Sequence, residues 1–493
     1  MAGVPTDRTI TSFDGTKIRA HWFPLAGATR AKPAPTVLMG PGWGSPGDTN
    51  TSSAGVFGAL NIDSLRKAGF NVLTWDPRGF GASGGTAEVD SKDFEGRDVQ
   101  VLLDWVAAQP GVQLDRAGDP RAGMVGGSYG GGIQLVVAAI DCRVDAIVPI
   151  VAWNSLGTSL AKARTPKIGW SNILVRVAAG RPVDPRTVRA NRTANERGVI
   201  DPADERWFLD RGPGALVSKI TAPTLLVSGT VDTLFTLDEA ITNYRILRGN
   251  GVPTAMVWFC GGHGTCLTSA GDLGRVPQAS IAWLQRWVQG RTSVATPAPF
   301  EFVDQNGSRY TSSAYPLPEA APLTGSGSGT LRLVAEGGAG PAVPPPSNKP
   351  DLLRGLVLAV TPSKAANAVD VPIDVAGRAA LVVGAPEVEL RYRGTVPAGE
   401  RPTRVFAQLV DEATGLALGN QITPIALTLD GAARTAKVPL EAVSYAVRPG
   451  TRLALQLVAT TTAYVQPRLG GTVTFASVKV RLPVAKGITP AGP

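Results

Sequence analysis

The sequence predicts two domains, an α/β domain with a mostly parallel sheet covered by helices on both faces and an all-β domain behind it. From Lys17 to Gly290, short apolar runs alternate with amphipathic stretches, as in chains of strand–helix–strand units. Beyond Gly290, strand-like runs follow one another without a helical pattern. A length of 493 residues also exceeds what one core normally supports.

Six apolar runs in the first region predict buried strands, because parallel strands are covered on both faces and lack polar alternation. They are 35–39, 70–75, 122–126, 144–151, 223–229 and 254–260. Helices are predicted between them. For example, Val99, Leu102, Leu103 and Val106 have the spacing of one helix face.

One long interval interrupts this alternation. About 70 residues, rich in proline, separate the runs at 144–151 and 223–229, and an insertion of that length predicts a cap over the sheet. Between Asn154 and Ile200 lie nine Lys or Arg residues against two acids, so most of the formal charge of +9 belongs to the cap. A charge confined to one segment, without a nucleic-acid motif, argues against a nucleic-acid partner.

The second region predicts an all-β sandwich. Its strand-like runs include 330–335, 352–360, 387–394, 404–412, 452–460 and 472–482, separated by turn-rich stretches such as "GSGSG" at 325–329. The predicted boundaries are 1–153 and 217–290 for the α/β domain, 154–216 for the cap, 291–299 for a linker and 300–493 for the β domain.

Two serines have the pattern G-x-S-x-G, Ser128 and Ser83. Ser128 follows a predicted strand and precedes the helix-competent run "IQLVVAAI", which is the context of a nucleophile on a sharp strand-to-helix turn. Ser83 stands beyond its nearest strand and is followed by polar residues. The sequence therefore favours Ser128 as a nucleophile over a serine that only packs in a turn.

A serine hydroxyl needs a base, normally a histidine oriented by a carboxylate. The chain has two histidines, and His263 follows a buried strand, whereas His21 lies in an early edge-strand pattern. Asp232, in the loop after "PTLLVSG", is the predicted acid, with Asp238 and Glu239 as the fallback. The order Ser, Asp, His is that of α/β-hydrolases.

An oxyanion hole is predicted from two loops. The backbone N–H of Tyr129 follows the nucleophile, and Trp43 lies in the loop "MGPGWGSPG" behind an early strand. Trp43 offers its backbone N–H or its indole N–H, or only lines the pocket. Asp76 and Arg78 in "WDPRGFGASGG" are interpreted as structural. This chemistry needs no cofactor.

Cys260 and Cys266 flank His263 at three residues on each side. A metal site is disfavoured because no further Cys/His pair is available to complete a tetrahedral shell. The glycines between the two cysteines allow a disulfide, while two reduced thiols remain the alternative in a reducing compartment. The start of the chain shows no signal-peptide pattern. No run of 18 apolar residues continues without interruption, so no transmembrane helix is predicted. A secreted mature form is favoured over a cytoplasmic one.

The stretches "DGTKIRAHWFP", "WDPRGFGASGG" and "GGSYGG", with the Asp232 and His263 loops, resemble the X-prolyl dipeptidyl-peptidase and cocaine-esterase group of α/β-hydrolases. The resemblance implies an α/β-hydrolase core with a helical cap, a C-terminal jelly-roll domain and the triad Ser128, Asp232 and His263. Members of this group often have a Tyr where this chain has Trp43.

The basic cap repels the free amine of a peptide substrate, which favours a small acyl substrate, neutral or anionic, and hence an ester hydrolase. Three alternatives stay open. An X-Pro dipeptidyl aminopeptidase would use the acidic stretch 201–210 as its amine anchor. An acyltransferase would use the same triad, and a degenerate hydrolase would only bind a ligand. The oligomeric state is not predicted.

Overall fold

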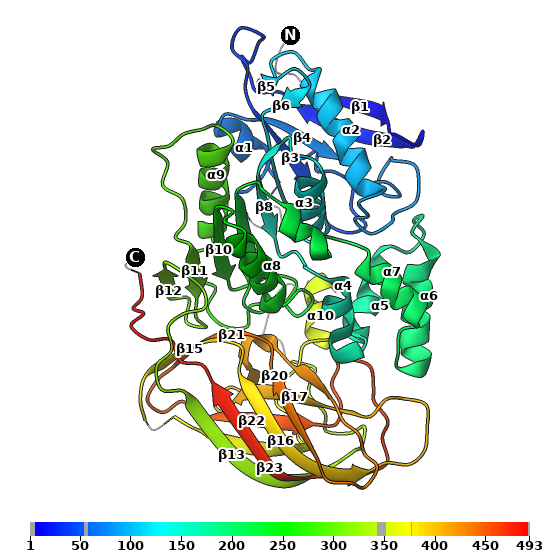
Figure 1. The fold of residues 1–493 in the computed structure, drawn as a ribbon, viewed down its shortest axis with the longest axis vertical. Helices are drawn as coiled ribbons and strands as arrows, with labels where there is room; N and C mark the ends of the chain where they lie inside the picture. Colours follow the sequence, from blue (N-terminus) through cyan, green and yellow to red (C-terminus); the bar gives the residue numbers. More distant parts are fainter. Residues whose placement is uncertain (1–4, 54–57, 343–351, 376, 492–493) are drawn as a thin grey trace.

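The computed structural model describes residues 5–53, 58–342, 352–375 and 377–491. Figure 1 shows the α/β domain at one end of the molecule and the β domain at the other, with the helices α4 to α7 beside their junction. Both parts of the predicted fold class are present.

Within the described residues, ten strands form one sheet in the α/β domain, in the order β1-β2-β4-β3-β7-β8-β9-β10-β11-β12. Neighbours from β4 to β11 are parallel, while β1, β2 and β12 join antiparallel. The strands are β1 (Thr6–Thr11), β2 (Lys17–Phe23), β3 (Thr36–Gly40), β4 (Asn71–Trp75), β7 (Ala122–Gly127), β8 (Val144–Ile150), β9 (Thr224–Gly229), β10 (Thr254–Phe259), β11 (Phe300–Val303) and β12 (Arg309–Ser312). The six strands predicted from apolar runs are β3, β4 and β7 to β10.

The direction in which the sheet grows reverses at β3. The chain passes from β3 outward to β4, then returns to β7 on the other side of β3 and continues through β8, β9 and β10. The loops that leave the carboxyl ends of β3 and β7 therefore diverge, which opens the crevice where ligands bind in sheets of this kind. Ser128 and Trp43 lie in these two loops.

Helices cover both faces of this sheet. The helices α2 (Glu95–Ala107), α3 (Tyr129–Ile140) and α8 (Leu237–Gly249) pack into the core on one face, and α1 (Ile62–Lys67) and α9 (Arg275–Trp287) pack on the other. A small hairpin, β5 (Leu114–Arg116) with β6 (Asp119–Pro120), lies outside the sheet.

The predicted boundary at residue 300 falls inside this sheet. β11 pairs in parallel with β10, and β12 closes onto β11, so the α/β sheet extends to Ser312. Phe300 and Phe302 are fully buried and pack on Trp258 of β10. These aromatic contacts hold the first strands after the linker in the α/β core.

The cap contains α4 (Leu156–Ala161), the 3₁₀ turn η1 (Lys162–Arg164), α5 (Ile168–Val177), α6 (Pro185–Arg197) and α7 (Pro202–Leu209), and the turn η2 (Gly214–Lys219) leads back to β9. Trp170, Trp207 and Phe208 of these helices form one apolar cluster with Trp153 and Phe235 of the α/β domain. The cap is thus packed onto the carboxyl edge of the sheet.

The β domain is built around a nine-stranded sheet within the described residues, in the order β18-β17-β22-β14-β13-β23-β16-β20, with β19 also on β17 and a separate pair β15-β21. Its elements are β13 (Leu323–Arg332), α10 (Leu352–Ala359), β14 (Ala368–Asp374), β15 (Ala380–Gly384), β16 (Glu387–Thr395), β17 (Arg404–Asp411), β18 (Leu416–Ala417), η3 (Leu418–Asn420), β19 (Thr423–Ala426), β20 (Arg434–Pro439), β21 (Val443–Val447), β22 (Leu453–Val458) and β23 (Thr472–Leu482).

Two predictions for this domain were wrong. "GSGSG" at 325–329 is not a turn but the middle of β13, where the Cα of Gly327 faces Val371 and that of Gly329 faces Val369 on the neighbouring strand. The run 352–360 is not a strand, because 352–359 form the helix α10, whose Val357 packs into the aromatic cluster under the cap. A short apolar run does not distinguish these two states by its periodicity.

Candidate active site

Ser128 occupies the sharp turn between β7 and α3. Its backbone has φ 56° and ψ −118°, a strained conformation that persists only where the surroundings impose it. The Ser128 N–H donates to Ile150 O of β8 at 2.9 Å. A Cβ atom on Gly126 would lie 2.6 Å from Gly40 O, and one on Gly130 would overlap the same carbonyl. The flanking glycines therefore allow the turn to pack against β3.

His263 approaches this serine from the loop after β10. Its Nε2 atom lies 2.8 Å from Ser128 Oγ, and its Nδ1 atom lies 2.8 Å from Asp232 Oδ2. Because the carboxylate only accepts, Nδ1 carries the proton and Nε2 accepts from the serine hydroxyl. The ring also packs edge-on against Phe235 and Trp170. The imidazole is thus oriented as a base toward Ser128.

Asp232 is fully buried in the loop after β9 and has both oxygens occupied. Oδ1 accepts from the N–H groups of Leu234 at 2.9 Å and Phe235 at 2.8 Å. Oδ2 accepts from the backbone N–H of His263 at 3.0 Å as well as from Nδ1. Four donors hold this carboxylate in the position from which it orients the imidazole.

The fallback acids lie elsewhere. Asp238 pairs with Lys162 of the cap at 2.9 Å, and Glu239 accepts from the N–H groups of Asn154 at 2.8 Å and Ser155 at 3.0 Å. Both residues fasten the cap to α8. Burial raises the pKa of Asp238 to about 7, with Glu441 adding to the shift.

His21 and Ser83 have structural partners at the β2–β4 end of the sheet. His21 Nδ1 lies 2.8 Å from Asp7 Oδ1, and Nε2 lies 3.2 Å from Asp76 Oδ1. Its strand β2 is the second strand of the sheet, not the edge strand that we predicted. The Ser83 hydroxyl donates to Asp76 O and accepts from the backbone N–H of Arg19, so it links its loop to β2.

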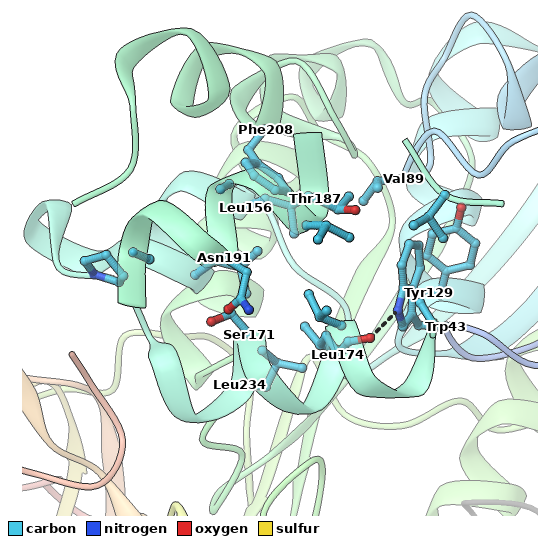
Figure 2. A pocket seen from close by; sticks show the side chains of 18 of the residues that line it. Trp43, Val89, Tyr129, Leu156, Ser171, Leu174, Thr187, Asn191, Phe208 and Leu234 are labelled. Atoms are coloured by element: carbon cyan, nitrogen blue, oxygen red, sulfur yellow. Dashed lines mark hydrogen bonds between the residues drawn. The ribbon is translucent and has the colours of Figure 1, made fainter. Parts of the chain in front are cut away.

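The loop after β3 holds Trp43 beside Ser128. Its indole N–H donates to Leu174 O of the cap at 3.1 Å, a bond drawn in Figure 2, and its ring packs edge-on against Phe80 and Tyr129. The indole is therefore engaged by the cap, which leaves the backbone N–H as the candidate donor of Trp43. Gly47 N donates to Asp76 Oδ1 at 2.8 Å and fixes the end of this loop.

A buried acidic group lies behind Tyr129, where sequence reasoning placed no functional residue. The phenol donates to Glu95 Oε1 at 3.2 Å and accepts from Asp90 N at 3.3 Å. Burial raises the pKa of Glu95 to about 7 and raises that of Asp90 well above its usual range. Arg78 forms a salt bridge with Asp98 at 2.7 Å in the same region, in keeping with a structural role.

Cys260 and Cys266 form a disulfide bond with their Cα atoms 5.6 Å apart, and the loop that it closes contains His263.

The β domain contacts this loop and the loop that contains Asp232. Asn420 Nδ2 donates to Thr265 O at 2.9 Å, and Gln421 Nε2 donates to Asp232 O at 2.8 Å. No sequence pattern pointed to these two amides, because their role depends on how the domains pack.

Two cavities meet at Ser128. The first, which we call the cap pocket, has a volume of about 370 Å³ and lies between the cap helices and Tyr129. The second, which we call the histidine chamber, has a volume of about 580 Å³ and is lined by His263 and the loop after β3. Trp43 and Leu174 line both cavities and form the partition between them.

In the described part of the chain, no group of three or more His, Cys, Asp or Glu side chains is arranged to hold a metal ion. No helix in those ranges is long and apolar enough to cross a membrane.

Comparison with known families and structures gives consistent matches. The family model of the X-Pro dipeptidyl-peptidases (S15 family) matches residues 14–265. The fold resembles a CocE/NonD family hydrolase from Staphylococcus aureus, with a TM-score of 0.65, 13% identity and coverage of 99% of this chain and 97% of that one. An α-amino acid ester hydrolase gives a TM-score of 0.67 at 14% identity, covering 98% and 96%.

An aminopeptidase from the marine sediment archaeon Thaumarchaeota archaeon gives a TM-score of 0.71 at 12% identity and covers 99% of this chain and 97% of that one. Among curated proteins, the polyketide transferase grgF from a Penicillium species is 25% identical over 147 residues, 29% of this chain. The match spans 44% of the length of that relative. At these identities the solved structures define the fold that the chain shares with them.

Proposed function

The chain belongs to the X-Pro dipeptidyl-peptidase (S15) family and is a hydrolase, and we propose that it cleaves carboxylic esters through an acyl-enzyme on Ser128. The observation that carries this proposal is the 2.8 Å contact between Ser128 Oγ and His263 Nε2, with Asp232 behind the imidazole. A serine hydroxyl oriented in this way on a base is an activated nucleophile.

In the proposed mechanism, Ser128 Oγ attacks the ester carbonyl while His263 Nε2 takes its proton. Asp232 stabilises the imidazolium, and the backbone N–H groups of Trp43 and Tyr129 receive the oxyanion. His263 then returns the proton to the departing alcohol. Water, activated by the same nitrogen, releases the acid and regenerates the serine.

The charge of the cap pocket supports an ester over an X-Pro peptide. A dipeptidyl peptidase needs an anion for the free amine of its substrate, but no Asp or Glu is among the described residues that line the cap pocket. The acidic stretch 201–210 is largely neutralised within the cap, because Asp204 pairs with Arg189 and Glu205 with Arg164. A positively charged amine would enter the pocket without a partner.

The test compares Ser128→Ala with Ser83→Ala, because both serines have the same G-x-S-x-G flanking. Ser128→Ala is expected to abolish hydrolysis of p-nitrophenyl acetate and labelling by a fluorophosphonate probe, while Ser83→Ala keeps both. Undiminished ester turnover by Ser128→Ala would contradict the triad. Faster turnover of a Gly-Pro-anilide than of the ester would make the chain a dipeptidyl peptidase.

Acyl transfer is a second candidate, favoured by the size of the histidine chamber. About 580 Å³ beside His263 leaves room for an acceptor larger than water. Adding primary alcohols or amines to the ester assay measures how the acyl group divides between water and the added acceptor. A transferase would convert most of the acyl group to the new ester or amide, and a hydrolase would still release the free acid.

A further inference from the structure

The cap pocket is built almost entirely from apolar groups. Leu156, Leu160 and Phe208 of the cap, Leu234 of the α/β domain and Val89 supply much of its wall. The polar side chains that face it are few, and Figure 2 shows Ser171, Thr187 and Asn191 among them. Arg181, on the exposed segment after α5, is the one charged residue among the described lining residues.

The position of His263 distinguishes the two cavities. The imidazole must protonate the leaving alcohol and later activate water, so both have to lie on the side of the serine where Nε2 is. His263 lines the histidine chamber and does not belong to the lining of the cap pocket. The leaving group and water therefore occupy the histidine chamber.

The acyl group must then extend in the other direction. Ser128 and Trp43 lie at the boundary of both cavities, and Tyr129, the second oxyanion donor of the proposed mechanism, lines the cap pocket. A carbonyl placed between these two N–H groups has one substituent directed toward His263 and the other toward the cap pocket. The second substituent is the acyl chain.

We propose that the cap pocket binds the acyl group of the substrate, and that this group is an uncharged hydrocarbon chain or ring larger than acetyl. The proposal rests on the esterase function proposed above and names its substrate class. A volume of about 370 Å³ is within the range of small-molecule sites, far more than an acetyl group fills. A cationic acyl group would find no acidic partner among the described lining residues, and an anionic one would lose its hydration for a single partner, Arg181, at the exposed rim, which disfavours both.

The first experiment measures kcat/KM of the wild-type protein for p-nitrophenyl acetate, butyrate, hexanoate, octanoate and benzoate. Each methylene that the pocket buries is expected to raise kcat/KM about fourfold until the pocket is full. Octanoate should exceed acetate by more than about tenfold. A profile that is flat or falls from acetate onward would overturn the substrate class while leaving the esterase itself intact. Loss of acetate turnover in Ser128→Ala reports separately on the esterase.

The second experiment places a charge in the pocket with little change of shape. Asn191→Asp introduces a carboxylate at a half-buried lining position of α6, and Asn195→Asp introduces the same charge one turn later, at an exposed position that does not line the pocket. Asn191→Asp is expected to lower kcat/KM for octanoate about tenfold or more and to leave acetate within about twofold. Asn195→Asp should change neither. An equal loss for both esters in Asn191→Asp would overturn the assignment of the pocket.

A steric variant keeps the proposal testable if the charge disturbs the cap. Ala190 is buried on α6 and lines the same pocket, so Ala190→Met fills part of its volume with a flexible side chain. The chain-length optimum is expected to move to a shorter acyl group with acetate turnover unchanged. An unchanged optimum in a folded Ala190→Met protein would contradict the proposal.

Discussion

The two histidines of the chain lie in similar settings but have different second partners. Each has one ring nitrogen 2.8 Å from an aspartate, Asp7 for His21 and Asp232 for His263. The other nitrogen of His21 faces the Asp76 carboxylate at 3.2 Å, whereas that of His263 faces the Ser128 hydroxyl at 2.8 Å. The two rings therefore differ in one neighbour: His21 has a second carboxylate where His263 has a hydroxyl.

That difference decides the chemistry. The hydrogen bond to Asp76, together with that to Asp7, raises the pKa of His21 even though burial opposes the shift. Because both ring nitrogens face carboxylate oxygens, which only accept, the surroundings favour the doubly protonated ring. A protonated ring between two carboxylates links them by hydrogen bonds, and it has no lone pair with which to accept a proton. His263 keeps a lone pair directed at a hydroxyl, which is what a general base requires.

The largest expected effect comes from exchanging each histidine for glutamine. His263→Gln should lower kcat for ester hydrolysis by roughly 10⁴- to 10⁶-fold, because it removes the base that lies 2.8 Å from Ser128 Oγ. His21→Gln should leave kcat within about fivefold, since the ring contacts Asp7 and Asp76 and not Ser128, and should lower stability instead. Steady-state kinetics on p-nitrophenyl esters compares the two. A comparable loss of kcat in both variants would contradict the distinction.

The aspartates behind the two rings give a second comparison. Asp232→Asn is expected to lower kcat about 10⁴-fold, because an amide at this position favours the wrong tautomer of His263. Asp76→Asn should lower kcat by less than about tenfold, since Asp76 bonds to Gly47 N at the end of the loop after β3 and, among the described residues, to no member of the triad. It should instead cost about 1–3 kcal/mol in the free energy of unfolding. A small effect of Asp232→Asn on kcat would remove Asp232 from the proposed triad.

Local sequence was sufficient for the residues that stand directly after strands. Ser128, Asp232 and His263 each follow a run of buried apolar residues, and parallel strands bring their carboxyl ends to one edge of a sheet. The spacing in the sequence therefore already implied that the three side chains lie near one another. The two cysteines beside His263 were also predictable as a pair from local sequence, because their geometry depends on the short loop between them.

Features that depend on packing between distant segments were not predictable. Asn420 and Gln421 of the β domain donate to the loops of His263 and Asp232, and only the docking of the two domains brings these amides there. The indole of Trp43 was available as an oxyanion donor in the sequence, but the cap carbonyl of Leu174 takes its N–H. β11 looked like the start of the second domain, because its aromatic contacts with β10 have no local signature.

The disulfide around His263 has no counterpart near His21, and removing it is a third test. The double variant Cys260→Ser/Cys266→Ser should lower the free energy of unfolding by about 2 kcal/mol, the loop-entropy estimate for so short a loop. The matched control is Cys142→Ser, which changes an exposed free cysteine and should have no effect. Urea denaturation followed by fluorescence measures both. Three titratable thiols in the denatured, unreduced protein would contradict the bridge.

The smallest effect concerns how stability depends on pH. Because the pKa of His21 is raised in the folded protein, the folded state binds its proton more tightly than the unfolded chain does. This contribution is fully present below the ordinary pKa of 6.5 and is lost as the pH rises through the raised value.

Two aspartates contribute on the acid side. Burial opposes the shift at Asp76, but hydrogen bonds from His21 and from backbone N–H groups lower its pKa. The hydrogen bond from His21 also lowers the pKa of Asp7. Their contribution persists until the pH falls below about 4.

Denaturation of the wild-type protein and of His21→Gln between pH 5 and pH 9 tests this assignment. Arg19, which also pairs with Asp7, stays charged throughout this range, so the change with pH belongs to His21. The difference in unfolding free energy between the two proteins should be largest near pH 5 and should shrink as the pH rises. A difference that is constant across the range would show that folding does not raise the pKa of His21, and a difference that grows with pH would show that the ring is neutral in the folded protein.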